Sequence, residues 1–359
     1  NLPSSIGLAV TEMITTANWA WAMYPGLSEG AIATLEDHGT EDQKKDYLTK
    51  LISGVWSGTM CLTEPHAGTD LGMIKTRAVP NADGSYSLSG TKIFITAGEH
   101  DLAENIVHLV LAKLPDAPAG PRGISLFLVP KMLVDENSEL TGERNGVRCG
   151  SIEHKMGIKA SPTCVMNFDE ATGYLVGELN NGLSHMFTMM NYERLSMGLQ
   201  ANGLADSAYQ VAAAYAKDRV QGRAPSGPQQ PEASADPLLV HPDVRRLLLT
   251  IRANILAGRS LSIFAAMQLD ISRFHPDAAA RTRADKLVSL LIPVQKAYCT
   301  DRGFDACVMA QQVLDMIREI EDDKQLLVAA ASLTKLTVEN FVLNTQLYQN
   351  TTLSPDKHK

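Results

Sequence analysis

The spacing of apolar side chains changes twice along this chain, and this pattern constrains the fold more than any other feature. Residues 1–54 and the residues after Gly182 have apolar side chains three and four positions apart, which is typical of amphipathic helices. Between about Trp56 and Leu175 the chain has short β-favouring runs separated by Gly, Pro, Asn and Asp. Because no helical crossover separates these runs, we expect an antiparallel barrel or sandwich between two helical regions.

The expected fold class is therefore α+β, with a helical domain over residues 1–54, a central β domain over 55–178 and a helix bundle over 179–359. Local motifs support these assignments. Thr40 and Gln43 have the spacing of a capping box at the start of a helix. Asn81–Gly84 is typical of a hairpin turn. The proline-rich segment 222–242 predicts a long loop between two helices.

The composition argues against several classes of protein. The net charge is −8 and the chain has no basic block, so we expect no nucleic-acid partner. The longest apolar runs, such as Trp19–Tyr24, have six residues, whereas a membrane-spanning helix needs about 20, so we expect no membrane span. The five cysteines are widely spaced and include no C-x-x-C pair, which predicts reduced thiols, no metal site and a cytoplasmic location.

Two segments carry the strongest functional signal. The first, Met60–Asp70, is a strand that leads into a turn, where hydroxyls and the amides of Ala67 and Gly68 could hold a pyrophosphate or a ring carbonyl. The second, Gly90–Gly98, alternates an aromatic residue with a threonine, which suits a flat ligand. The sequence contains no G-x-G-x-x-G, P-loop, G-x-S-x-G or H-E-x-x-H motif, so another architecture must hold any cofactor.

Together these two segments resemble the flavin-binding strands of the acyl-CoA dehydrogenase family, through the pattern T-E-P-x-A-G-[ST]-D followed by G-x-K-x-[WF]-I-T. The resemblance extends over essentially the whole chain. It is closest to the bacterial branch that acts on 3-methylmercaptopropionyl-CoA, through the segments 106–118, 123–131 and 151–164. It implies an incomplete N-terminal helical domain, a central β domain and a C-terminal helix bundle.

The resemblance also implies FAD as the cofactor and gives roles to individual residues. Thr63 and its neighbouring backbone would bind the pyrimidine edge of the flavin, Thr96 would donate toward N5, and Phe94 would shield one face of the ring. The other residues that it places around the cofactor are Met60, Leu62, Gly68, Thr69 and Ile95.

Further residues correspond to substrate-binding and intersubunit positions of the family. Thr69 would lie near the CoA arm, and Asn191 and Arg194 would line the CoA site, although the family often has an aspartate in place of Asn191. Arg223 resembles the arginine that reaches the FAD diphosphate of a neighbouring subunit, which implies a homodimer or a homotetramer.

The implied activity is α,β-dehydrogenation of an acyl-CoA thioester to the trans-2-enoyl-CoA, as in fatty-acid β-oxidation. Electrons would pass to an electron-transfer flavoprotein. The substrate would be 3-methylmercaptopropionyl-CoA or a short- or medium-chain acyl-CoA. Two alternatives remain open: a flavin-dependent acyl-CoA oxidase, and a non-catalytic acyl-CoA-binding or assembly protein without a base.

The sequence departs from the family pattern at the catalytic base. The family's base is a glutamate in a loop Y-E-G-T-x-x-I-Q, expected after the segment that corresponds to Val308–Val313, but here Val313 continues into Leu314–Asp323. We interpret this as a missing segment, which predicts a break in space between Val313 and Leu314. Glu319 and Glu321 lie in a charged run typical of a solvated helix face, so the catalytic residue stays unassigned.

Four methionines in the third region, Met186, Met189, Met190 and Met197, recur at helical spacing. This spacing predicts that they are mainly core residues. Some of them could line an acyl pocket, since thioether side chains adapt to varied chains.

Overall fold

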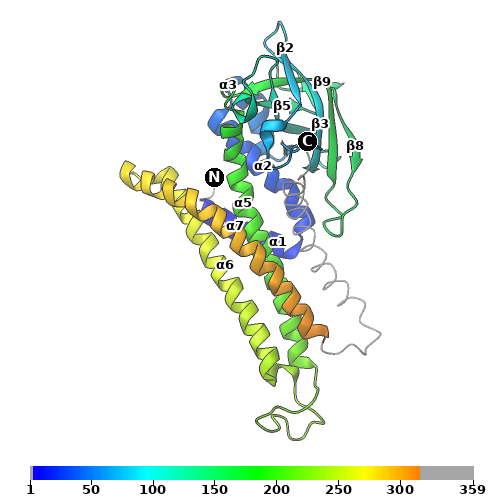
Figure 1. The fold of residues 1–359 in the computed structure, drawn as a ribbon, viewed down its shortest axis with the longest axis vertical. Helices are drawn as coiled ribbons and strands as arrows, with labels where there is room; N and C mark the ends of the chain where they lie inside the picture. Colours follow the sequence, from blue (N-terminus) through cyan, green and yellow to red (C-terminus); the bar gives the residue numbers. More distant parts are fainter. Residues whose placement is uncertain (1–2, 316–359) are drawn as a thin grey trace, which may run out of the picture. The chain divides into compact units, whose positions relative to one another are not determined.

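The computed structural model describes residues 3–315, and it combines helices and strands as expected (Figure 1). The chain divides into two compact units. Within the described residues, one contains the chain up to Trp19 together with Arg194–Asp315, and the other contains Ala20–Glu193. The three-domain division with boundaries at 54 and 178 stays a prediction; helices α1 and α2, which it places together, fall largely into different units.

The helices of the Ala20–Glu193 unit begin with α2, Trp19–His38. After Gly39 and Thr40 comes a continuous helical segment of three parts. These are the short helix α3, Glu41–Gln43, a π-helical turn, Lys44–Leu48, and α4, Thr49–Ile52. The predicted capping box is confirmed: the Gln43 amide donates to the Thr40 hydroxyl at 3.2 Å, and the Thr40 amide donates to the Gln43 side chain at 3.1 Å. Two donors at the helix start that would otherwise lack partners are thereby satisfied.

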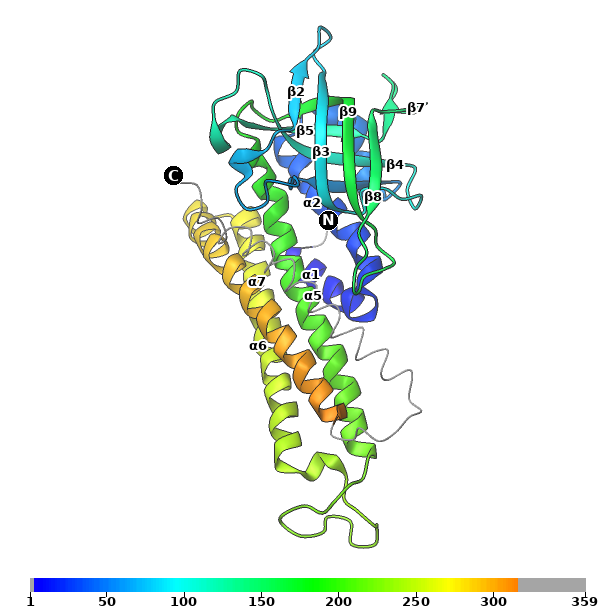
Figure 2. The same cartoon turned by 45° about the vertical axis from the view of Figure 1, so that its right-hand side comes forward.

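The β region forms a barrel whose strands lie in the order β1-β4-β2-β3-β9-β5, and pairing of β4 with β5 closes it (Figure 2). Strand β8 pairs with β9, while β6 and β7 form a separate ribbon. The strands are β1 Trp56–Cys61, β2 Arg77–Pro80, β3 Tyr86–Thr96, β4 Asn105–Lys113, β5 Ile124–Pro130, β6 Met132–Val134, β7 Leu140–Arg144, β8 Val147–Ile152 and β9 Thr163–Val176.

The expectation of a purely antiparallel sheet is wrong in one respect. Strand β1 runs parallel to β4, and β2 touches β4 in a parallel bridge. The connection from β1 to β4 contains the β2–β3 hairpin rather than a helix, so the absence of helical crossovers did not exclude a parallel pair. The predicted hairpin turn itself is confirmed, with the Asn81 amide bonded to Ser85 O at 2.8 Å and Gly84 at φ +86°.

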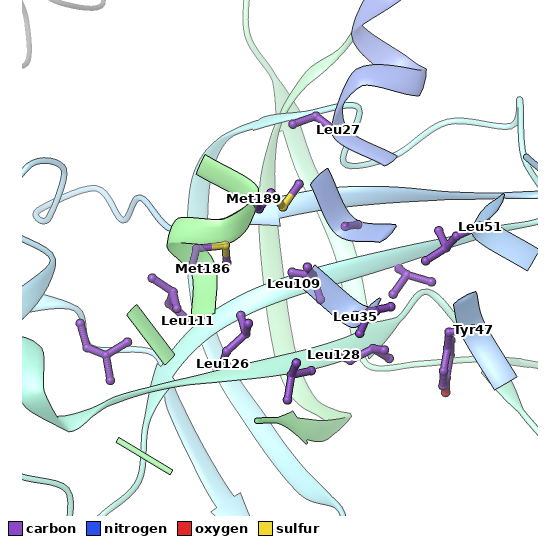
Figure 3. Close-up of a cluster of buried hydrophobic side chains, with 14 of the residues drawn as sticks. Leu27, Leu35, Tyr47, Leu51, Leu109, Leu111, Leu126, Leu128, Met186 and Met189 are labelled. Atoms are coloured by element: carbon purple, nitrogen blue, oxygen red, sulfur yellow. The ribbon is translucent and has the colours of Figure 1, made fainter. Parts of the chain in front are cut away.

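A hydrophobic core fills the space between this barrel and the adjacent helices (Figure 3). Leu27 and Leu35 of α2 and leucines of β4 and β5 contribute to it. Met186 and Met189, near the start of α5 (Gly182–Asp218), are fully buried in the same cluster. The prediction that these two methionines are core residues is therefore confirmed.

The other unit is a bundle built from α1 (Ser4–Ala17), the second part of α5, α6 (Pro242–Phe274) and α7 (Ala278–Asp315). Figures 1 and 2 show α6 and α7 running side by side. Small side chains, including Ala205, Ala208 and Ala212 on α5, are buried in its core. The predicted loop between α5 and α6 is confirmed, and Pro242 occupies the first turn of α6, where its missing amide costs nothing.

Helix α6 is long and apolar enough to cross a bilayer by length and composition alone, with 33% of its most apolar window buried. The expectation of no membrane span did not identify this helix, because it considered only uninterrupted apolar runs. Arg259 of α6 forms an ion pair with the buried Glu12 of α1, and Ile251 and Ile255 are buried in the bundle core. These contacts are those of a bundle helix, so the signal for a membrane span is weak.

The structure shows no break in space between Val313 and Leu314, whereas a segment missing from the sequence at this point stays a prediction. Helix α7 runs without interruption to Asp315 and contains both residues. Its buried positions Ala306, Ala310 and Val313 continue one helical face, so the apolar period itself extends to the junction. Glu319 and Glu321 lie outside the described residues.

Candidate active site

The two signature segments lie side by side. The turn that leaves β1 runs along β3, and the Ile93 amide donates to Thr63 O at 2.9 Å. The side chain of Lys92 also reaches the first segment, since its Nζ donates to Leu62 O at 3.0 Å. Two consecutive residues of β3 therefore hold two consecutive carbonyl groups of the segment Met60–Asp70.

A β-bulge in β3 makes this contact possible. Between the pairs Lys92–Met166 and Ile95–Cys164, strand β3 has two residues, Ile93 and Phe94, where β9 has one. The extra residue releases the Ile93 amide from the ladder with β9. It also shifts the alternation of side chains, so that Lys92 and Ile95, three positions apart, are both buried.

Phe94 occupies the outward position of this bulge. Its backbone has φ +60°, which is uncommon for a bulky residue, and its side chain is 41% exposed. A strained, exposed aromatic residue is a functional signal, because strain of this kind persists where the surrounding structure imposes it. This position suits the predicted role of Phe94 against one face of a flat ring.

The two threonines proposed for the ring edges are available to a ligand. Thr63 and Thr96 are half-buried, and neither hydroxyl has a hydrogen-bond partner among residues 3–315. Thr69 is exposed, while Met60, Leu62 and Gly68 are half-buried. The donor set therefore fits the polar edge of a flavin, with apolar side chains nearby.

One expectation about this region needs correction. The Ala67 amide is not free, because it donates to Glu64 O at 3.0 Å in a tight turn and Ala67 is buried. It therefore cannot hold a pyrophosphate. The side chain of Ile95 packs in the barrel core, so its predicted contact with the cofactor would come from its backbone and stays a prediction.

Sequence reasoning missed the buried ion pair beneath these segments. Lys92 is fully buried, and its Nζ lies 2.8 Å from Glu64 Oε1. Burial alone would raise the pKa of Glu64, but the charge of Lys92 and hydrogen bonds from Lys75 and Thr76 hold this pKa below its usual value. The signal was present in the sequence: Lys92 lies at an inward position of β3, where a lysine needs a carboxylate partner.

The resemblance places two residues of α5 in the CoA site, and their roles stay predictions. Asn191 is half-buried near the end of the Ala20–Glu193 unit, and Arg194 is half-buried at the start of the bundle segment of the same helix. Lys296 of α7 was also missed. Burial lowers its pKa and nearby Asp301 raises it, while the positive charge of Arg194 lowers it further, so two cationic side chains lie near each other in the bundle.

Arg223 is held by its own loop. Its guanidinium donates to Gln230 O at 3.0 Å, to Ala233 O, and to Asp236 Oδ1 at 3.4 Å. Asp236 is buried and also accepts from the amides of Ala224, Gln229 and Gln230. A contact of Arg223 with a neighbouring subunit stays a prediction; the structure gives it a fixed position in the loop.

Glu193, next to Arg194, is a further residue that sequence reasoning missed. It lies against α2, where its Oε1 is 3.4 Å from the position that a side chain on Gly30 would occupy. Burial, aided by the charge of Glu29, raises its pKa to about 8. A carboxyl group with this pKa is protonated at neutral pH.

This pKa predicts how stability depends on pH. The unfolded chain releases the Glu193 proton above about pH 4.5, whereas the folded chain keeps it until about pH 8, so stability falls across this range. We expect Glu193→Gln to unfold with nearly the same free energy as wild type at pH 5 and to be about 3 kcal/mol more stable at pH 8. Urea unfolding at both pH values measures this. Glu36→Gln, at an exposed position of α2, is the control, and an equal gain from Glu193→Gln at both pH values would refute the assignment.

Comparisons with known proteins agree with this geometry. The family model for the middle domain of acyl-CoA dehydrogenases matches residues 59–171, and the model for their C-terminal domain matches residues 180–316. The 3-methylmercaptopropionyl-CoA dehydrogenase of Ruegeria pomeroyi is 50% identical over 312 residues, which are 87% of this chain and 52% of that protein. The broad-specificity linear acyl-CoA dehydrogenase FadE5 of Mycobacterium tuberculosis is 39% identical, with the same coverage of 87% and 52%.

The fold is also that of a solved relative. Butyryl-CoA dehydrogenase from Megasphaera elsdenii superposes with a TM-score of 0.73 at 24% identity, over 95% of this chain and 81% of that chain. The chain spans about half the length of the curated relatives it matches. Two models of one family, matching consecutive parts of the chain, agree with both the sequence motifs and the fold. The chain therefore belongs to the acyl-CoA dehydrogenase family.

Proposed function

We propose that this chain binds FAD and catalyses α,β-dehydrogenation of an acyl-CoA thioester. The observation that carries the proposal is the hydrogen bond of Thr63 to the bulge of β3, beside the exposed ring of Phe94 and two hydroxyls that have no partner within residues 3–315. These groups match the needs of a planar ring with a polar edge. When bound, FAD would accept the hydride equivalent that leaves the β-carbon of the substrate.

The protein's own residues would bind and orient the reactants. Thr63 and Thr96 would hold the edge of the ring by hydrogen bonds, and Phe94 would cover one face. Asn191 and Arg194 would bind the CoA moiety. A hydrogen-bonded thioester carbonyl would make the α-proton easier to remove.

The substrate and partners follow from the family. We propose 3-methylmercaptopropionyl-CoA or a short- or medium-chain acyl-CoA as substrate, supported by the 50% identity to the Ruegeria enzyme. We also propose an electron-transfer flavoprotein as acceptor, a homodimer or homotetramer in which Arg223 contacts a neighbouring subunit, and a cytoplasmic location, consistent with five free cysteines.

A second function is favoured by one observation. Helix α7 is continuous across Val313 and Leu314, and the sequence contains no Y-E-G-T loop, so the family's glutamate base has no counterpart. A chain without this base could bind acyl-CoA and FAD without turnover.

An anaerobic titration of the FAD-loaded protein with a panel of acyl-CoA thioesters tests the proposal. We expect the visible absorbance of the bound flavin to bleach with at least one thioester and to recover when an electron-transfer flavoprotein is added. Thioester binding without bleaching would support the non-catalytic function instead. Stoichiometric hydrogen peroxide on aerobic turnover would identify an oxidase. A protein that binds neither FAD nor thioester would contradict both functions.

A further inference from the structure

Lys92 and Glu64 lie at a junction of three chain segments. Lys92 Nζ donates to Glu64 Oε1 at 2.8 Å and to Leu62 O at 3.0 Å. The same Oε1 accepts from the Thr76 amide at 3.0 Å and the Thr76 hydroxyl at 2.6 Å, and Oε2 accepts from the Lys75 amide at 2.7 Å. The pair therefore connects the turn after β1, the entry to β2 and the bulge of β3.

At this junction the backbone of β3 passes very close to Thr76. Gly90 on β3 has φ +157°, and a side chain there would come within 2.5 Å of Thr76 Oγ1 and 2.8 Å of Thr76 Cα. Only glycine lets β3 pass this near to Thr76. Thr76 then brings its amide and hydroxyl to Glu64, which in turn holds Lys92.

Stability alone does not account for a pair in this position. Both side chains are almost completely buried, at 0% and 2% exposure, and Lys92 lies near the buried Cys61 of the barrel core. Removing two charges from water costs about as much as their attraction returns, so apolar residues of similar size often give equal stability. What apolar residues cannot provide is a hydrogen bond to Leu62 O and a clamp on the Lys75 and Thr76 amides.

The contacts of Lys92 and Glu64 lie directly beside the residues of the candidate flavin site. Lys92 holds the carbonyl of Leu62, and the next residue, Ile93, holds the carbonyl of Thr63. The direction of the Thr63 side chain and amide is therefore fixed relative to Phe94, one residue further along β3. A shift of Lys92 would change the spacing between the threonine edge and the aromatic ring.

We propose that Lys92 and Glu64 are positioning residues for the flavin, which set the distance between Thr63 and the Phe94 bulge and thereby the affinity and the electronic environment of the bound ring. This proposal rests on the proposed flavin site. It assigns the pair no contact with the cofactor. It predicts that the geometry of the site, rather than the fold, depends on the pair.

The test uses the double variant Lys92→Met/Glu64→Leu, because a single replacement would leave one buried charge unpaired and could prevent folding. We expect this variant to fold and to melt cooperatively. Its dissociation constant for FAD should rise at least tenfold, the absorbance spectrum of its bound FAD should shift, and amide exchange at Ile93 should accelerate. The spectra are measured at saturating FAD, so that a difference in spectrum cannot come from a smaller fraction of bound cofactor.

Two controls isolate the positioning role. Lys50→Met/Glu139→Leu removes an exposed ion pair of the same unit and should change none of the three readouts. Leu128→Ala removes a buried core side chain and should lower stability without shifting the flavin spectrum.

The outcomes separate this proposal from the flavin site itself. If wild type binds FAD and the double variant has the same affinity and spectrum, the positioning role is wrong and the flavin site stands. If wild type binds no FAD, both are overturned. If the Leu128→Ala spectrum shifts as much as that of the double variant, the effect is one of general stability and the positioning role is also wrong.

Discussion

Replacing Glu12 with alanine is expected to lower the free energy of unfolding of the helix bundle by about 3 kcal/mol. Glu12 of α1 is 7% exposed and accepts from Asn202 of α5 at 2.8 Å and from Arg259 of α6 at 2.8 Å. Its removal leaves the buried Asn202 amide without its acceptor, and it leaves the partly exposed Arg259 guanidinium paired with Asp206 alone. Chemical denaturation followed by circular dichroism measures the loss.

Two further variants serve as controls for Glu12→Ala: one breaks a surface ion pair, and the other replaces both Glu12 and Arg259. Asp305→Ala breaks the exposed pair with Arg302 on α7 and should cost less than about 0.5 kcal/mol. Glu12→Met/Arg259→Met should recover most of the stability that Glu12→Ala loses, because methionine side chains fill the space of the pair and Asp206 keeps Arg252 as its partner. A small loss in Glu12→Ala would mean that α1 does not pack in the bundle as the structure places it.

Replacing Gly182 with alanine should destabilise the Ala20–Glu193 unit by about 3 kcal/mol. Gly182 begins α5, and a side chain there would lie 2.2 Å from Leu126 N and from Ser125 C on β5. Both obstacles are backbone atoms, so the helix start would have to move away from the barrel. Because α5 carries Asn191, we also expect weaker CoA binding, measured by calorimetry.

Gly26→Ala is the matched control for this change. Gly26 lies within α2 of the same unit, and a side chain there would meet no atom within 4 Å. Alanine at this position should stabilise the protein by up to about 1 kcal/mol, because glycine is a poor helix former. If both substitutions had the same small effect, the close packing of α5 against β5 would be refuted.

The sequence predicted the order of the structural regions because hydrophobic period is a local property. The capping box at Thr40 and the turn at Gly84 were also predictable, since each depends on residues within a few positions. The parallel pairing of β1 with β4 was not, because it depends on which distant edges meet when the barrel closes. The expected gap at Val313 was inferred from a resemblance, whereas the helical period itself continued through that position.

In the candidate site, too, local motifs were predictable from the sequence, whereas contacts made by folding were not. Thr63, Phe94 and Thr96 could be proposed from the sequence because the family motif includes them, and their roles stay predictions. Glu64 and Lys92 stand in the same motifs, yet their pairing depends on a bulge and a tight turn that only the folded chain brings together. Glu193 was missed because its raised pKa comes from packing against α2, which no spacing along the sequence reports.

A crystal structure of the chain with bound FAD tests the central claim most directly. We expect the flavin ring to lie against the outer face of the β3 bulge, with one face on Phe94 and with the hydroxyls of Thr63 and Thr96 within hydrogen-bond distance of its polar edge. A ring bound elsewhere, or Phe94 packed against protein with no ring beside it, would contradict the account.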